Sequence, residues 1–369
     1  MKQIQIWWYG AFILLSTCTG GIYAQYDSIR PVKAFLSLNV SFHKGFIIPH
    51  SAAIRSVSYS KPWITEIDLA WHFSTEKAWQ YCSCYPRIGL SAQYINFDNL
   101  KVLGRGYALT PYVEPFLSAY RKFSLSVRFA AGIIYLDNVY HPIHNPENLF
   151  YSSHISYLLS VSTAINYRLT SSFNIRLAGN YNHISNGGNR EPNKGINFPT
   201  LSIGFDKYLE PVKFISREKA TSKIPEKRSV FKLALLGTAK KPFPEENNRF
   251  LLFGIYFSWS YFLGGQSAFT TGLEYINDRS LKEFLKRTEA SYPDHKKIGY
   301  LAGHEFQLGR FRFSQQLGIY LYSPAKAKDP VYQRWGLDFF VLKSFYMGAN
   351  LKAHRHVADF MDFRVGIVW

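Results

Sequence analysis

Residues 63–73 read Trp-Ile-Thr-Glu-Ile-Asp-Leu-Ala-Trp-His-Phe, and Glu66, Asp68 and His72 lie on the parity opposite to the tryptophans. Successive side chains of a β-strand point to opposite faces, so this stretch predicts a strand with one apolar and one polar face. The same alternation recurs in the stretches 123–133, 155–166, 335–341 and 361–369. Repeated alternation of this length is typical of the strands of an outer-membrane β-barrel.

The composition agrees with an exported membrane protein. The chain has 369 residues, a formal net charge of +18 and 17% aromatic residues, whereas only 18% are charged. The excess of Lys and Arg favours anionic lipid headgroups as partners, and no motif of a nucleic-acid-binding fold is present. Beyond the N-terminal segment no apolar run reaches the ~18 residues of a membrane-spanning helix, which excludes a helical inner-membrane protein.

The sequence divides into four segments. Residues 1–24, with Lys2 before an apolar run, predict a signal peptide that is cleaved after Ala24. Residues 25–209 form the first strand-rich unit, residues 210–228 a polar linker rich in lysine, and residues 229–369 a second strand-rich half. The final residue, Trp369, is the terminal aromatic expected of an outer-membrane barrel. Cys82 and Cys84 are too close for an easy disulfide and are expected to be incidental, the alternative being a strained or redox-active pair.

Connection lengths support the barrel, because such barrels have short periplasmic turns and long extracellular loops. The tight connections predict turns at 120–121, 170–171, 264–265 and 309–310, and the long ones lie at 47–62, 137–153, 186–196 and 278–295. The first eight strands are expected at 33–46, 63–74, 86–97, 105–119, 122–136, 154–168, 172–185 and 197–208. About eight more follow, and we expect all of them to close as one larger antiparallel barrel, since open edges are not tolerated in lipid. Two eight-stranded barrels are the alternative.

The strand at 172–185 ends in a polar pair on its apolar face. His183 and Ser185 share the parity of Leu177 and Tyr181, so both are expected to face lipid rather than the barrel interior. A serine attacks an ester when a base removes its proton, and side chains two apart on a strand lie side by side. The structural alternative is that an apolar stripe becomes polar where it meets the headgroups.

The residues that follow strengthen the catalytic interpretation. Asn186-Gly187-Gly188 comes directly after the pair, then Pro192-Asn193-Lys194-Gly195, and Asn197 begins the next strand. Asn side chains and glycine amides can stabilise the oxyanion of a tetrahedral intermediate. With these residues the sequence resembles the PagL-type lipid A 3-O-deacylases (acyloxyacyl hydrolase-like), whose signature runs His-x-Ser-Asn and then Pro-Asn-x-Gly.

The resemblance implies an eight-stranded outer-membrane barrel over about residues 25–210, with Ser185 as nucleophile and His183 as base. It also implies that Asn186 and Gly188 form the oxyanion hole, with Asn193 in support. The family has a Glu as third member where this chain has Asn197. An Asn can hold an imidazole in one tautomer without stabilising its charge, and Glu191 in the same loop is the alternative third member.

The sequence therefore predicts an outer-membrane serine esterase that removes an ester-linked acyl chain from lipid A in the outer leaflet, with the site at the outer-leaflet rim and neither cofactor nor metal. One alternative is a non-catalytic, porin-like barrel with an inherited motif, which the neutral Asn197 would favour. Another is an esterase for a different membrane lipid, because the acyl-ester chemistry is shared. His354, in the second half, lies on the polar parity of its strand and is not expected to take part in catalysis.

Overall fold

The computed structural model describes residues 34–187, 190–217, 228–243, 246, 248–264, 266–288, 294–325, 329–355 and 357–369. The expected signal peptide and residues 218–227 of the expected linker lie outside this described part, as does Gly188. None of the described helices is long and apolar enough to cross a membrane.

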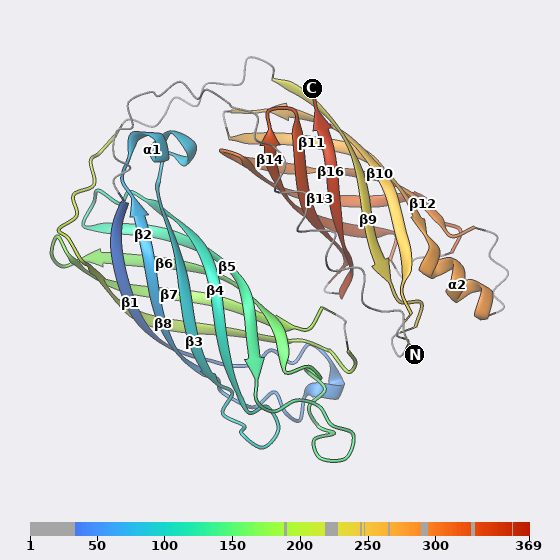
Figure 1. Cartoon of the computed structure of the whole chain (residues 1–369), viewed down its shortest axis with the longest axis horizontal. Coiled ribbons are helices and arrows are strands. Elements are labelled where there is room, and N and C mark those ends of the chain that lie inside the picture. Colours follow the sequence, from blue (N-terminus) through green and yellow to red (C-terminus); the bar gives the residue numbers. More distant parts are fainter. Residues whose placement is uncertain are drawn as a thin grey trace, which may run out of the picture. The chain divides into compact units, whose positions relative to one another are not determined.

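The first eight strands form a closed antiparallel barrel (Figure 1), in which each strand pairs with the next and β8 pairs with β1. The predicted ranges match the observed ones to within two residues. The strands are β1 Ala34–Gly45, β2 Trp63–Phe73, β3 Tyr85–Asn96, β4 Arg105–Leu117, β5 Phe123–Leu136, β6 Ile155–Arg168, β7 Phe173–Ser185 and β8 Ile196–Tyr208.

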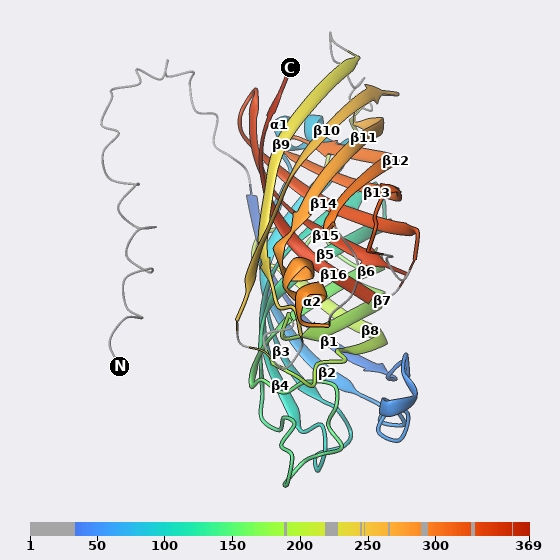
Figure 2. The same ribbon diagram turned by 90° about the vertical axis from the view of Figure 1, so that its right-hand side faces the viewer.

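A second closed barrel contains the remaining eight strands, with β16 paired to β9. In both barrels the strands run obliquely, as Figures 1 and 2 show. The strands are β9 Ser229–Lys240, β10 Phe250–Phe262, β11 Ser267–Asp278, β12 Lys296–Leu308, β13 Phe311–Tyr322, β14 Val331–Leu342, β15 Phe345–His354 and β16 Val357–Val368, and a helix, α2 Arg279–Arg287, follows β11.

The expectation of one larger barrel is therefore wrong, and the alternative of two eight-stranded barrels is right. The pairing of β1 with β8 runs from Ser37 opposite Tyr208 to Gly45 opposite Thr200, which leaves no open edge in the first unit. Trp369 and Phe231 exchange backbone hydrogen bonds of 3.0 and 3.1 Å and close the second unit in the same way. Each barrel therefore pairs its own edge strands. A barrel of eight strands is also narrow enough for side chains to fill its interior.

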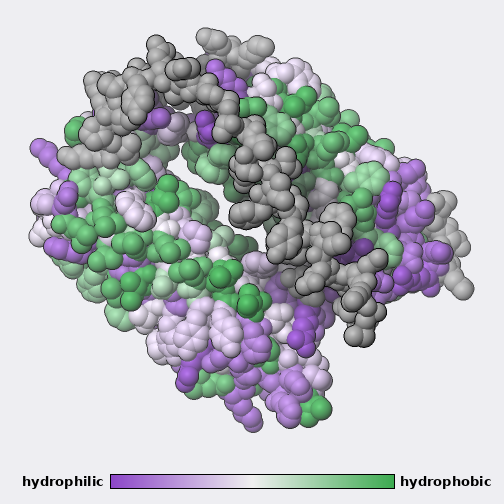
Figure 3. All heavy atoms as spheres, in the orientation of Figure 1, coloured by the Kyte–Doolittle hydropathy of each residue, from purple (hydrophilic) through white to green (hydrophobic). Residues whose placement is uncertain are grey.

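Many apolar side chains gather on the outer surface of the first barrel, with more hydrophilic ones toward the long loops, on the face that Figure 3 shows. Ile67, Leu125 and Ile165 are 54, 49 and 50% exposed on this surface. The residues that alternate with them along each strand point inward, and these residues are largely buried and polar. This is the arrangement expected of a barrel in lipid.

Inside the first barrel the polar residues form an ion-pair network. Arg128 contacts Glu66 at 2.8 Å and Asp68 at 2.9 Å, and its Nε lies 3.1 Å from Glu114. Arg87 joins Glu114 to Asp206 through two contacts of 2.8 Å. Buried charges are tolerated when they are paired and hydrogen-bonded, so this network fills the middle of the barrel, while apolar clusters fill the part beneath the long loops and the α1 end.

The two ends of the first barrel differ. The connections 46–62, 97–104, 137–154 and 186–195 lie at one end, and the opposite end carries the short turns 118–122 and 169–172. That opposite end also carries the helix α1, Glu76–Cys82 (Figure 1), after which Cys82 and Cys84 form a disulfide, contrary to expectation. The left-handed conformation of Ser83, with φ of 49°, turns the chain back so that the two cysteines meet.

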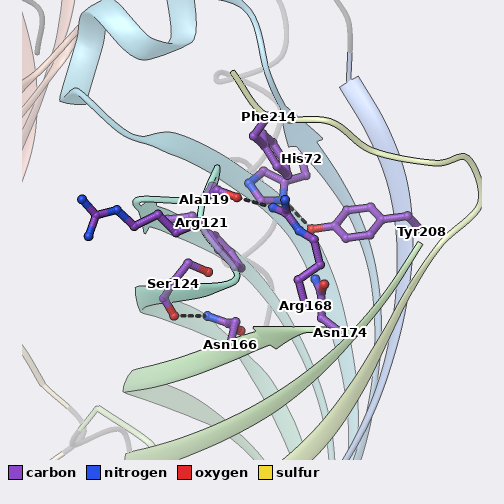
Figure 4. A pocket seen from close by; sticks show the side chains of 10 residues that line it. His72, Ala119, Arg121, Ser124, Asn166, Arg168, Asn174, Tyr208 and Phe214 are labelled. Atoms are coloured by element: carbon purple, nitrogen blue, oxygen red, sulfur yellow. Dashed lines mark hydrogen bonds between the residues drawn. The ribbon is translucent and has the colours of Figure 1, made fainter. Parts of the chain in front are cut away.

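A small polar hollow lies inside the α1 end of the first barrel (Figure 4). The Nδ1 atom of His72 lies 2.7 Å from the hydroxyl of Tyr208, and its Nε2 lies 3.1 Å from the carbonyl of Tyr85. Phe214, which follows β8, is only 6% exposed and covers this hollow. The start of the expected linker therefore packs on the first barrel through apolar residues, although the linker as a whole is rich in lysine.

Candidate active site

Strand β7 places His183 and Ser185 on the outer face of the first barrel. Leu177 and Tyr181 on the same parity are 57 and 48% exposed, whereas Ile184, which lies between His183 and Ser185, is fully buried. His183 and Ser185 continue this outward row and are both partly buried. They lie where β7 ends and the connection 186–195 begins, at the end of the barrel that carries the long loops.

The neighbouring strand places Asn197 directly opposite His183 in the register of β7 with β8. The Nδ1 atom of His183 lies 2.7 Å from Oδ1 of Asn197. Because an amide oxygen only accepts hydrogen bonds, this contact requires a proton on Nδ1. A neutral His183 then has an unprotonated Nε2, which is the state that a general base needs.

The hydroxyl of Ser185 receives two hydrogen bonds. The side-chain Nδ2 of Asn193 donates to Oγ over 3.0 Å, and the backbone N–H of Gly187 donates over 3.2 Å. Both lone pairs of the oxygen are therefore engaged, which leaves the hydroxyl proton free to be donated elsewhere. Within the described part of the chain, the structure contains no hydrogen bond between His183 and Ser185.

Asn186 supports the loop rather than the hydroxyl. Its side chain is only 1% exposed and donates to the carbonyl of Arg190 over 2.7 Å, an oxygen that Ser152 also contacts at 2.7 Å. Its backbone N–H donates to Oδ1 of Asn193 over 3.3 Å. Asn186 thus orients the amide of Asn193, which is the amide that contacts Ser185. Gly188, the other residue expected at the oxyanion hole, lies outside the described residues.

The connection after β7 is also held from the neighbouring loop. The N–H of Lys194 donates to the carbonyl of Leu149 over 3.0 Å, and the N–H of Gly195 donates to that of Phe150 over 2.9 Å. Phe150 is fully buried in the apolar cluster beneath these loops. The loop that carries Asn193 is therefore fixed by backbone bonds to a packed core.

Gly195 packs directly against the imidazole of His183. A Cβ atom added at this position would lie 2.9 Å from Cε1 and 3.6 Å from Nε2 of that ring. The glycine has a φ of +68°, in the left-handed region that other residues rarely adopt. Only glycine leaves the Nε2 edge of His183 uncovered with this backbone.

Glu191 does not contact His183. Its Oε2 atom accepts the backbone N–H of Asn193 over 2.8 Å, and its side chain is exposed. Of the two residues expected as third member, the structure therefore brings Asn197 to His183 and leaves Glu191 to stabilise the loop.

His50, which no sequence pattern indicated, lies on the far side of Asn197. Its Nδ1 atom is 3.3 Å from Nδ2 of Asn197, and its Nε2 is 3.0 Å from the carbonyl of Lys194. The chain beyond β1 continues along β8, with the N–H of Ile48 donating to the carbonyl of Asn197 over 2.8 Å. Only the closure of β1 onto β8 brings these residues together, so no local signal in the sequence could have identified His50.

Two family models match the chain over most of its length. The model described as lipid A 3-O-deacylase (PagL) matches residues 63–206, and the model described as acyloxyacyl hydrolase, C-terminal domain, matches residues 229–369. No curated protein sequence matches.

Among solved structures, the outer membrane enzyme PagL is 14% identical, with 45% of this chain and 97% of that chain covered and a TM-score of 0.33. Neisserial surface protein A is 14% identical, with 47 and 96% covered and a TM-score of 0.30. A porin of Rhodopseudomonas blastica is 7% identical, with 90 and 99% covered and a TM-score of 0.18.

The two matched regions together contain nearly all the strands of both barrels, and both models describe parts of one kind of protein. The chain therefore belongs to the PagL family, the lipid A 3-O-deacylases of the bacterial outer membrane.

Proposed function

We propose that this protein is a serine esterase of the outer membrane that removes an ester-linked acyl chain from lipid A, with the 3-position as the expected site of cleavage. The observation that carries the proposal is the hydrogen bond of 2.7 Å between His183 and Asn197 beside the partly buried Ser185, on the lipid-facing side of the barrel. This side gives an acyl chain in the membrane direct access to the serine.

The reaction begins with the attack of Ser185 Oγ on the ester carbonyl while Nε2 of His183 takes the hydroxyl proton. The proton on Nδ1, held by Asn197, keeps Nε2 available for this step. The contact between His183 and Ser185 forms when the acyl chain binds, because catalytic hydrogen bonds often close only in the substrate complex.

The negative charge that develops on the carbonyl oxygen needs N–H donors near Ser185. Nδ2 of Asn193 and the N–H of Gly187 already converge on Oγ and supply two of them. Collapse of the tetrahedral intermediate breaks the ester bond, and His183 gives the proton to the leaving sugar oxygen, which departs as a hydroxyl group. Water then hydrolyses the acyl-enzyme by the same steps, which releases a fatty acid and restores Ser185.

The surroundings of the site support lipid A as the substrate. Arg190 and Lys194 are exposed in the connection that carries Asn193, and a cationic side chain there suits the phosphates of lipid A. The loops at this end are the longer ones, which by the rule for such barrels lie outside the cell, where the outer leaflet contains lipid A.

Mass spectrometry of lipid A tests the proposal in cells that express the wild-type chain, Ser185→Ala, His183→Ala or His354→Ala. We expect wild type and His354→Ala to remove one acyl chain, and the other two variants to leave lipid A intact. His354 is a suitable control because it contacts Tyr320 in the second barrel at 3.1 Å. Intact lipid A with correctly folded wild-type protein would refute the proposal, and a change in phospholipids instead would indicate another substrate.

A further inference from the structure

His50 and His183 contact opposite ends of one side-chain amide. Oδ1 of Asn197 lies 2.7 Å from Nδ1 of His183, and its Nδ2 lies 3.3 Å from Nδ1 of His50. The other ring nitrogen of His50 lies 3.0 Å from the carbonyl oxygen of Lys194. A continuous chain of three hydrogen bonds thus runs from a backbone carbonyl to the imidazole beside Ser185.

The donor and acceptor roles in these three hydrogen bonds are set by the contact between His50 and the carbonyl of Lys194. A backbone carbonyl only accepts, so Nε2 of His50 must donate to Lys194. A neutral His50 then presents Nδ1 as an acceptor, and the N–H of the Asn197 amide, with Nδ2 3.3 Å away, satisfies it. The amide oxygen consequently faces His183 and accepts its Nδ1–H.

The carbonyl of Ile48 also lies near His50, 3.3 Å from Nδ1. A proton on Nδ1 alone would satisfy Ile48 but would place the lone pair of Nε2 against the oxygen of Lys194 at 3.0 Å. The closer contact therefore selects the tautomer with the proton on Nε2.

We infer that His50 is a positioning residue, which fixes the orientation of the Asn197 amide and thereby the tautomer of His183. The inference rests on the proposed function, because it gives the role of His50 in that reaction. A neutral amide needs such a partner: turned by 180°, Asn197 would donate to Nδ1 of His183, Nε2 would carry the proton, and His183 could not act as a base. A carboxylate at this position has no wrong orientation.

The first experiment compares kcat and KM for lipid A deacylation by full-length wild type, His50→Ala, His50→Asn and His50→Gln. Alanine is expected to lower kcat about tenfold with KM nearly unchanged, because it removes one oriented hydrogen bond from the site. Asparagine can place an acceptor near the position of Nδ1 and should recover part of the loss, whereas glutamine reaches Lys194 instead and should not. His144→Ala, in an exposed loop, is the control and should match wild type.

The second experiment repeats His50→Ala in the Asn197→Glu background. The carboxylate only accepts, so the tautomer of His183 no longer depends on His50, and the loss should fall to about twofold or less. A loss of the same size in both backgrounds would mean that His50 merely supports the loop, and the inference would then be wrong.

A readout that does not need activity separates this inference from the proposed function. Chemical shifts of the ring nitrogens in ¹⁵N-histidine-labelled protein in detergent micelles report which nitrogen carries the proton, and the His183→Gln variant identifies the signals of His183. We expect Nδ1–H in wild type and a mixture of tautomers in His50→Ala. An unchanged Nδ1–H state in His50→Ala overturns the inference, even if wild type proves inactive on lipid A.

Discussion

At position 197 the chain has an amide where its resemblance to the PagL family predicts a carboxylate. Asn197 accepts the Nδ1–H of His183 at 2.7 Å, so it supplies orientation without a charge. A carboxylate would additionally stabilise the imidazolium that forms when Ser185 loses its proton. With the neutral Asn197, the maximum rate of the proposed reaction is therefore expected to be lower than with a carboxylate in the same geometry.

The first prediction concerns this residue. Asn197→Glu is expected to raise kcat about tenfold, because a charge-assisted hydrogen bond replaces a neutral one. Steady-state deacylation of purified lipid A in detergent measures it, with Asn197→Ala, which removes the hydrogen-bond acceptor and supplies no charge, as the matched loss-of-function variant. A kcat at or below the wild-type value in Asn197→Glu would indicate that the site depends on the amide itself.

Gly195 gives a second prediction at the residue scale. Gly195→Ala places a Cβ 2.9 Å from Cε1 of His183 on a backbone with φ of +68°, so we expect kcat to fall about tenfold or more. Gly179→Ala, on the strand β7 that carries His183, is the control, because its added Cβ meets nothing within 4 Å. Equal activities of the two variants would show that the ring of His183 can move without loss.

At the scale of the strands, one carboxylate connects much of the first barrel's interior. Glu114 on β4 is fully buried and contacts Arg87 on β3, Arg128 on β5 and Arg176 on β7. Ser126 also donates to it over 2.6 Å. Because these partners come from three other strands, β3, β5 and β7, the network resists shear between β4 and its neighbours as well as filling space.

We therefore predict that Glu114→Gln lowers the free energy of unfolding of the first barrel by about 3–5 kcal/mol, since the guanidinium groups lose their shared counter-charge. Urea unfolding of the purified protein, followed by heat-modifiable migration in gels, measures the change. Glu147→Gln, at an exposed position in the 137–154 connection, should leave unfolding unchanged. Comparable midpoints for both variants would mean that the network contributes little.

At the scale of the whole molecule, each set of eight strands closes on itself. The first barrel has its own paired edges, its own buried ion network, and the residues around Phe214 that cover one end. The residues that meet at the candidate site all come from this barrel. Nothing in the proposed reaction draws on a residue of β9–β16.

We expect a chain that stops after residue 217 to fold and to deacylate lipid A within about twofold of the full-length rate, because a closed eight-stranded barrel has no edge left to satisfy. Heat-modifiable migration establishes folding, and mass spectrometry of lipid A establishes activity. A folded but inactive product would assign the second barrel a part in substrate binding or presentation.

The sequence predicted the strands well because alternation is a local property. Each of the first eight ranges was correct to within two residues, and parity alone placed His183 and Ser185 on the outer face. The motif also indicated Asn193 and Asn197. These residues, like His183 and Ser185, lie on two adjacent strands or on the connection between them. Within such a hairpin, register follows from the turn and from the apolar pattern.

Contacts between residues far apart in the sequence could not be predicted from local alternation. Whether β8 returns to β1 or continues to β9 depends on pairing between residues more than 150 positions apart, and both choices satisfy the same alternation. The same closure brings His50 to Asn197, 147 positions away. Local alternation was therefore enough to predict the strands, their faces and the outward placement of His183 and Ser185. The number of barrels and the residue that orients Asn197 required the folded structure, since both depend on non-local backbone hydrogen bonds.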